Sequence, residues 1–135
     1  MVKAILPQRH QDSWGSGAFG ASRGTRVHKG IDYCCYPGTV IQAGVAGTVS
    51  KLGYPYGDDL SFRYVEITTP DQLRHRYFYV EPLVKSGDAI TEGMPIGTAQ
   101  DIAGRYRDPA KAPMTGHVHF EILQPDGTPI NPGEI

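Results

Sequence analysis

Two histidines separated by one residue, His117 and His119, form the pattern in the sequence that best suits chemistry. A β-strand places residues i and i+2 on one face about 6.5 Å apart, so both imidazoles would face the same space. One ring could then hold a metal ion while the other acts on a water molecule at that ion. His28 and Asp32 form a second pair far upstream, with Gly30 between them. Together these residues offer three imidazoles and one carboxylate that can converge on a zinc ion.

The upstream pair suits a metal site because of the chain conformation expected around it. Gly30, with Gly24 before it and Pro37 after it, argues against a helix and for a loop that leads into a strand. Gly30 would let the backbone bend so that His28 and Asp32 both turn inward. A catalytic zinc site typically has three protein ligands at about 2.0–2.2 Å and a position left for water. The alternative is a set of hydrogen-bonded core histidines with an aspartate in a turn.

Short β-prone runs recur along the chain between glycine- and proline-rich turns, and several alternate apolar with polar residues. They cover residues 39–43, 47–52, 62–68, 75–80, 95–99 and 117–123. With 17 Gly, 11 Pro and few helical stretches, the sequence predicts an all-β fold, an antiparallel sandwich or barrel with long loops flanking a groove. The polar connection 100–116 is a candidate wall of that groove.

Length and charge limit the classes of protein to consider. The 135 residues suit one domain, residues 1–135. A formal net charge of −1 argues against nucleic acid or an anionic membrane as partner. No apolar run reaches the ~18–20 residues that span a bilayer. Residues 1–7 are too short and too soon broken by Pro7 to form a secretory signal, so we expect synthesis in the cytoplasm.

Several motifs, in this order, resemble the LytM/lysostaphin-type zinc endopeptidases, a peptidoglycan-cleaving family with a duplicated-hybrid-motif β fold. They are Gly17-Ala-Phe-Gly, His28-Lys-Gly-Ile-Asp32, residues 37–49, Gly93-Met-Pro-Ile-Gly97, Thr115-Gly-His-Val-His-Phe-Glu-Ile122 and Asn131-Pro132. The resemblance implies a Zn²⁺ cofactor held by His28, Asp32 and His119. It also implies His117 as a catalytic residue and a peptidoglycan peptide as substrate.

Tyr79 departs from the family pattern. The family usually has a second catalytic histidine in a Tyr-x-His motif, and here the matching segment reads Tyr77-Phe78-Tyr79. This segment resembles the leukocyte-derived chemotaxin branch, which keeps the zinc site and is regarded as lacking peptidase activity. His75 would share a strand face with Tyr79 but lie about 13 Å away, so it cannot stand in.

Two roles remain open for Tyr79. A phenol has a reference pKa near 10, which makes it a poor base at neutral pH but a competent hydrogen-bond donor. It could therefore stabilise the oxyanion that forms when water attacks an amide, leaving His117 as the only base. The alternative is an aromatic side chain that packs beside a vestigial zinc site.

Three functions follow from these residues. The leading hypothesis is a zinc-dependent endopeptidase of peptidoglycan, acting at the cell wall or periplasm as a bacteriophage lysin or as part of a virion. The second is a catalytically inactive zinc-binding module that recognises cell-wall or protein ligands. The third is a structural component of a phage tail or secretion apparatus.

Other residues receive weaker predictions. Glu121 shares a strand face with His117 and His119, and it is either a support for a metal ligand or an ordinary strand carboxylate. The adjacent Cys34 and Cys35 are expected to be small buried strand residues without a disulfide bond, and His75, like His10, is expected at the surface. Four aromatic residues in glycine-rich loops could line a peptide groove: Trp14, Phe19, Tyr54 and Tyr56.

Overall fold

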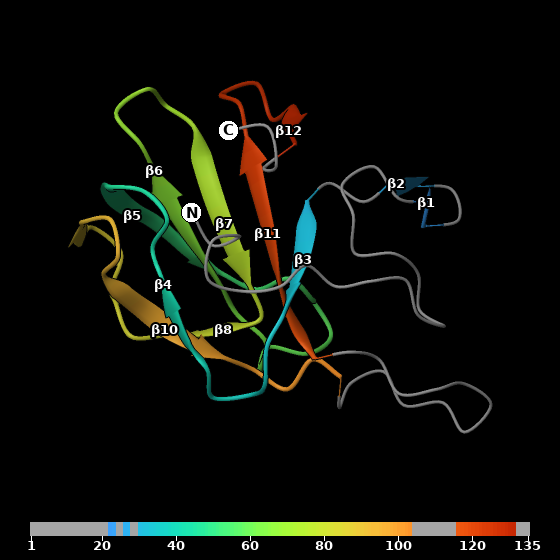
Figure 1. The fold of residues 1–135 in the computed structure, drawn as a ribbon. Helices are drawn as coiled ribbons and strands as arrows, with labels where there is room; N and C mark the ends of the chain where they lie inside the picture. The colour runs from blue at the N-terminus through green and yellow to red at the C-terminus, as the bar shows by residue number, and fades with distance from the viewer. Residues whose placement is uncertain (1–21, 24–25, 28–29, 104–115, 132–135) are drawn as a thin grey trace.

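The computed structural model describes residues 22–23, 26–27, 30–103 and 116–131 (Figure 1). This part of the chain contains twelve strands and no helix. The strands are β1 (Ser22–Arg23), β2 (Arg26–Val27), β3 (Ile31–Cys34), β4 (Val40–Gln42), β5 (Gly47–Gly53), β6 (Tyr64–Thr68), β7 (Arg74–Phe78), β8 (Val80–Pro82), β9 (Ala89–Ile90), β10 (Pro95–Ala99), β11 (His117–Leu123) and β12 (Pro129–Ile130). Within the described residues, no helix has the length and apolar character needed to cross a membrane.

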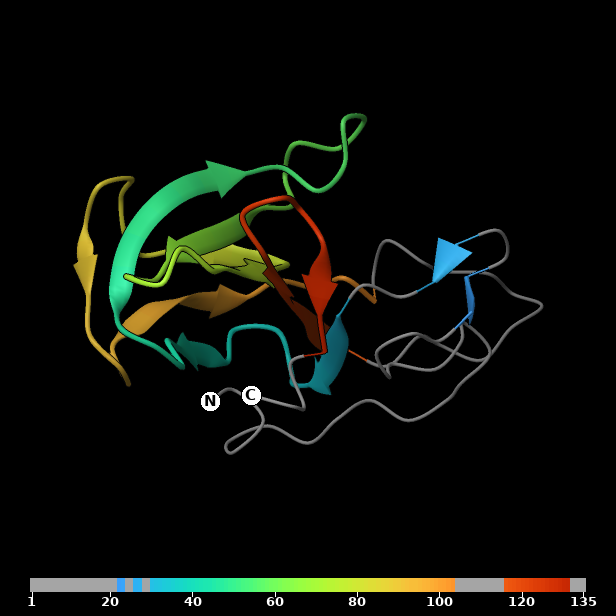
Figure 2. The same cartoon turned by 90° about the horizontal axis from the view of Figure 1, so that it is seen from above.

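The strands pair into a large and a small antiparallel sheet, beside the short β1–β2 pair. The large sheet has seven strands in the order β12-β11-β7-β6-β5-β9, with β3 paired to the first half of β11. The small sheet has the order β4-β10-β8. A register shift between Val49 and Lys51 interrupts the β5–β6 ladder, and β5 arches strongly where it passes the other strands (Figure 2). The predicted all-β antiparallel class is confirmed.

Alternation along the central strands gives the large sheet two different faces. One face joins the small sheet in a common core, which includes Val65, Ile67, Tyr77, Val118, Phe120 and Ile122 from the large sheet and Ile41, Val80, Ile96 and Ala99 from the small one. The Tyr77 hydroxyl accepts a hydrogen bond of 3.0 Å from the backbone N–H of Gly44, which ties the segment after β4 to this core. The other face carries polar side chains from β11, β7 and β6, including both histidines of the opening motif.

The chain crosses from the large sheet to the small one at Tyr79. β7 ends at Phe78 and β8 begins at Val80, and the two strands belong to different sheets. Tyr79 has a φ of 66°, in the left-handed region. The predicted continuous strand over 75–80 is therefore wrong at this residue, because a left-handed residue ends the regular alternation of faces. For the same reason, His75 and Tyr79 do not share a strand face.

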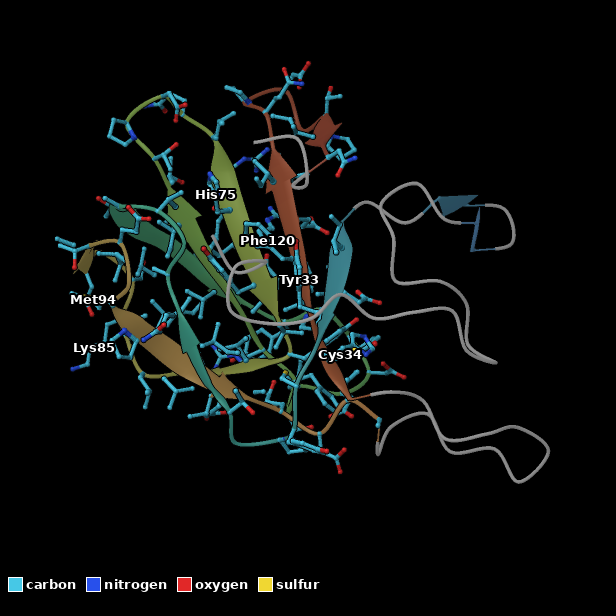
Figure 3. All side chains as sticks on the ribbon, viewed as in Figure 1. Tyr33, Cys34, His75, Lys85, Met94 and Phe120 are labelled. Carbon is cyan, nitrogen blue, oxygen red and sulfur yellow. The ribbon has the colours of Figure 1, made fainter. Side chains whose placement is uncertain are left out.

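His75 is buried, so the prediction that it lies at the surface is wrong. Its side chain is on the core face of β7, and its ring lies 5.9 Å from the ring of Phe120 (Figure 3). Among the described residues its Nδ1 has no hydrogen-bond partner. The reason is the register of β7: alternation places residue 75 on the same side as the fully buried Tyr77.

The two cysteines are half-buried at the end of β3, so the prediction of fully buried strand residues holds only in part. No disulfide joins them in the described structure, as predicted. Burial, together with the neighbouring Cys34, raises the pKa of the Cys35 thiol to about 11. This thiol is therefore protonated at neutral pH and is not suited to act as a nucleophile.

Candidate metal and catalytic site

The pairing of β3 with β11 brings three of the predicted site residues together. In this register His119 lies directly opposite Asp32, and His117 opposite Cys34. The Nδ1 of His119 is 2.9 Å from Oδ1 of Asp32, and the Nε2 of His117 is 3.5 Å from Oδ2 of the same carboxylate. All three side chains are buried. Asp32 thus stands between the two histidines.

The close approach of β3 to β11 depends on Gly30. A Cβ atom added at this residue would lie 2.2 Å from the carbonyl oxygen of Phe120, which is a backbone atom and cannot rotate away. Gly30 was expected to let the chain bend. In the structure Gly30 has a further role. Because it has no side chain, its backbone can lie this close to β11.

Glu121 occupies the other side of the His119 ring. Its Oε1 lies 2.9 Å from Nε2 of His119, so the ring is held between two carboxylates. Burial by itself lowers the pKa of His119, but the hydrogen bonds to Asp32 and Glu121 outweigh it and raise this pKa to about 8. Of the two roles left open for Glu121, the contact with His119 supports the one in which it orients this ring.

The residues present fit a zinc ion. Two ligand atoms at about 2.0–2.1 Å from a tetrahedral zinc lie roughly 3.3 Å apart, close to the 2.9 Å between Nδ1 of His119 and Oδ1 of Asp32. Metal-binding histidines almost always donate their other ring N–H to a carboxylate, carbonyl or water, which is the contact Glu121 makes. The described residues alone contain no complete group of three metal-binding side chains. His28, the third predicted ligand, lies outside them, and its role stays a prediction.

Aromatic rings surround Tyr79 beside the site. Its ring packs edge-on against His117 at 5.7 Å and stacks on Tyr56 at 6.1 Å, with an interplanar angle of 12°. The Tyr56 and Tyr79 hydroxyl oxygens are 3.4 Å apart, and Phe62 lies edge-on to both rings. Tyr79 and His117, both predicted as catalytic residues, therefore lie side by side, and their roles stay predictions. Tyr56 belongs to this cluster through its loop after β5.

The structure describes only some of the residues predicted to line the groove. Tyr54 is half-exposed, and the central guanidinium carbon of Arg63 lies 4.3 Å from the centre of the Tyr54 ring. Trp14, Phe19 and most of the connection 100–116 lie outside the described residues. Arg76 and Glu66, which no motif of the sequence singled out, pair at 2.7 Å on the same face as Glu121. The two arginines at alternate positions of β7, Arg74 and Arg76, were the signal that could have indicated this polar face.

The sequence of this chain matches the model of a known protein family. The sequence model of peptidase family M23 matches residues 26–132. The chain belongs to peptidase family M23. This match covers β2 through β12 and contains every predicted site residue, including His28 and Tyr79.

Two similar proteins differ in what their names say. This M23 chain is 31% identical over 99 residues to the peptidoglycan DD-endopeptidase ShyC of Vibrio cholerae, a match that covers 73% of this chain and 20% of ShyC. It is 27% identical over 110 residues to mouse (Mus musculus) leukocyte cell-derived chemotaxin-2, covering 82% of this chain and 69% of that protein. The chain thus spans only about a fifth of the length of ShyC.

The fold is also that of solved M23 domains. A mutant catalytic domain of the prophage-encoded M23 protein EnpA from Enterococcus faecalis superposes with a TM-score of 0.65 at 24% identity, covering 96% of each chain. At this identity the likeness concerns the fold alone. It agrees with the β-rich architecture that the sequence predicted.

Proposed function

We propose that this M23 chain is a zinc-dependent endopeptidase that cleaves peptide bonds of bacterial peptidoglycan. The observation that carries the proposal is the buried pair of Asp32 and His119, whose ligand atoms are 2.9 Å apart on adjacent strands. The likeness to ShyC, named as a peptidoglycan DD-endopeptidase, supports peptidoglycan as the substrate. The site of action that we propose is the cell wall, reached as a lysin or as part of a virion.

The residues around the proposed metal position have different chemical roles. Asp32 and His119, with His28, would hold zinc, which would supply Lewis-acid chemistry and lower the pKa of a water molecule at the site to about 7. His117 stands beside Asp32 and takes a proton from the attacking water, then passes it to the leaving amine. Tyr79 borders His117 and donates a hydrogen bond to the oxyanion of the attacked carbonyl.

The test is the clearing of suspended cell walls, purified from Gram-negative and Gram-positive bacteria so that different peptides are present. We expect zinc-loaded protein to reduce the turbidity, a chelator to stop the reaction and added zinc to restore it. His117→Ala should bind zinc as before while losing about 10²–10⁴-fold in rate, because it removes the base and no proposed ligand. Clearing that is insensitive to chelator, or no clearing by zinc-loaded protein, would overturn the proposal.

A second candidate is a zinc-binding recognition module without peptidase activity. The specific observation in its favour is Tyr79 in the position of the family's second catalytic histidine, together with the likeness to chemotaxin-2. This candidate predicts that zinc-loaded protein sediments with cell walls and leaves their turbidity unchanged. It is contradicted if the protein releases soluble peptides from those walls.

A further inference from the structure

Three charged side chains lie in line across the polar face of the large sheet. Glu121 in β11 is directly opposite Arg76 in β7, and Arg76 is directly opposite Glu66 in β6. Cross-strand neighbours at directly opposed positions are within reach of one another, and opposite charges there are stabilising. The row therefore runs acid, base, acid, and its first member is the residue that contacts His119.

Arg76 is held in position by Glu66 and Tyr64, which lie on its side away from the proposed metal position. Its Nε donates to Oε2 of Glu66 at 2.7 Å, and the guanidinium group lies 5.3 Å from the centre of the Tyr64 ring. Ser50 donates to the other oxygen of Glu66 at 2.7 Å, so both carboxylate oxygens are occupied. These contacts hold the guanidinium group in position independently of its contact with Glu121.

From this fixed position Arg76 reaches the far oxygen of Glu121. Its Nη1 lies 3.8 Å from Oε2 of Glu121, while Oε1 of the same carboxylate faces Nε2 of His119 at 2.9 Å. The two oxygens of Glu121 are thus divided between the guanidinium group and the histidine ring. Both carboxylates in the row are buried, where attraction between opposite charges is screened less than at the surface.

We propose that Arg76 is a positioning residue for the metal centre: it orients Glu121, and Glu121 orients the His119 ring. This inference rests on the proposed function, in which His119 is a zinc ligand. Without Arg76 the Glu121 carboxylate loses the charge that attracts Oε2, so it can rotate away from Nε2. His119 then loses the contact that aims its Nδ1 toward Asp32.

The experiment compares Arg76→Gln with Arg74→Gln in the full chain. Arg74 lies on the same strand and the same face, and its guanidinium group donates to the carbonyl of Gln124. Both variants lose one positive charge and gain the same amide, so they differ only in the neighbour that is affected. Zinc affinity is measured by competition with a chromophoric chelator, and the thermal midpoint of the metal-free protein reports on folding.

We expect Arg76→Gln to weaken zinc binding about 10–100-fold, the range for residues that support a metal ligand. Arg74→Gln should bind zinc within about threefold of the wild type, and Arg76→Lys should recover part of the affinity because it restores the charge. Equal zinc affinities for Arg76→Gln and Arg74→Gln would overturn the inference. So would a loss in Arg76→Gln that only follows a lower thermal midpoint, with no recovery in Arg76→Lys.

A second measurement separates this inference from the proposed function. In metal-free protein, the Nε2 proton of His119 should exchange slowly with water in the wild type and in Arg74→Gln, and faster in Arg76→Gln, as followed by proton NMR. If the wild type binds no zinc, the proposed function fails while this comparison still decides the role of Arg76. If zinc binds and the exchange rates are equal, the positioning role fails while the function stands.

Discussion

Tyr79 adopts a left-handed conformation beside the proposed metal centre. A φ of 66° is rare for a bulky residue and costs about 1–3 kcal/mol, which the surrounding structure must offset. Here its N–H donates to the carbonyl of Arg63 and its carbonyl accepts from the N–H of Gln100, both at 2.8 Å. These bonds hold the residue at the crossing between the sheets, with its ring against His117. Strained residues of this kind cluster at active sites, so the conformation of Tyr79 supports a catalytic role for its hydroxyl group.

At this residue we predict the effect of removing one hydroxyl group. Tyr79→Phe should lower the cleavage rate about 10²–10³-fold, since it removes a donor to the oxyanion and keeps the ring that packs on His117. Tyr56→Phe is the matched control, because it removes the hydroxyl 3.4 Å from that of Tyr79 and leaves the donor in place. Single-turnover rates on a soluble peptidoglycan fragment measure the difference, and equal rates for both variants would contradict the role.

Restoring the family's histidine gives an independent test of Tyr79. If the tyrosine is a working donor, Tyr79→His should cleave within about tenfold of the wild-type rate. If the tyrosine instead disabled the site, the same variant should gain activity by far more than that. Turbidity loss of cell walls by the two proteins at equal zinc content distinguishes the two cases.

Among the elements, the β3–β11 pair carries the site. β11 supplies His117 and His119, β3 supplies Asp32, and their register places the last two opposite each other. Gly30 allows this pairing because its position faces the carbonyl of Phe120 without a side chain between them. The geometry of the proposed metal ligands Asp32 and His119 therefore depends on a close approach of two backbones, at Gly30 and Phe120.

Gly30→Ala tests this dependence at the level of the strand pair. The added methyl group would push β3 away from β11, and overpacking of this kind costs about 1–3 kcal/mol of stability. Zinc affinity should fall with it, because Asp32 moves relative to His119. Gly57→Ala is the control, since nothing lies within 4 Å of its added Cβ. Urea midpoints measure the stability of the two variants and chelator competition measures their zinc affinity, and a Gly30→Ala midpoint equal to that of the control would refute the argument.

The whole molecule is stabilised by a core shared between two sheets, and the buried His75 is a titratable residue on the core face. Burial lowers the pKa of His75, with Asp71 opposing the shift. A histidine with a lowered pKa in the folded state binds its proton more readily when unfolded. Stability should therefore fall as the pH drops below about 6.5, the ordinary histidine pKa, until the folded protein also takes up the proton.

We predict that His75→Leu flattens this pH dependence. The slope from one proton is at most about 1.4 kcal/mol per pH unit, so the difference between variant and wild type should grow from pH 7 to pH 5. The variant also removes the Nδ1 atom that has no hydrogen-bond partner among the described residues. Urea unfolding at several pH values measures the difference, and parallel profiles for the two proteins would contradict it.

Local sequence was enough to place six of the strands and to put His117 and His119 on one strand face, because alternation and i, i+2 spacing act within a few residues. Asp32 was assigned to the same site from its residue type and motif, and the β3–β11 register is what brings it opposite His119. The tertiary structure decided what depends on strand neighbours. It set Arg76 between Glu121 and Glu66, buried His75 and turned the chain at Tyr79. Strand order and register join residues far apart in the chain, and no local pattern specifies which strand lies next to β7.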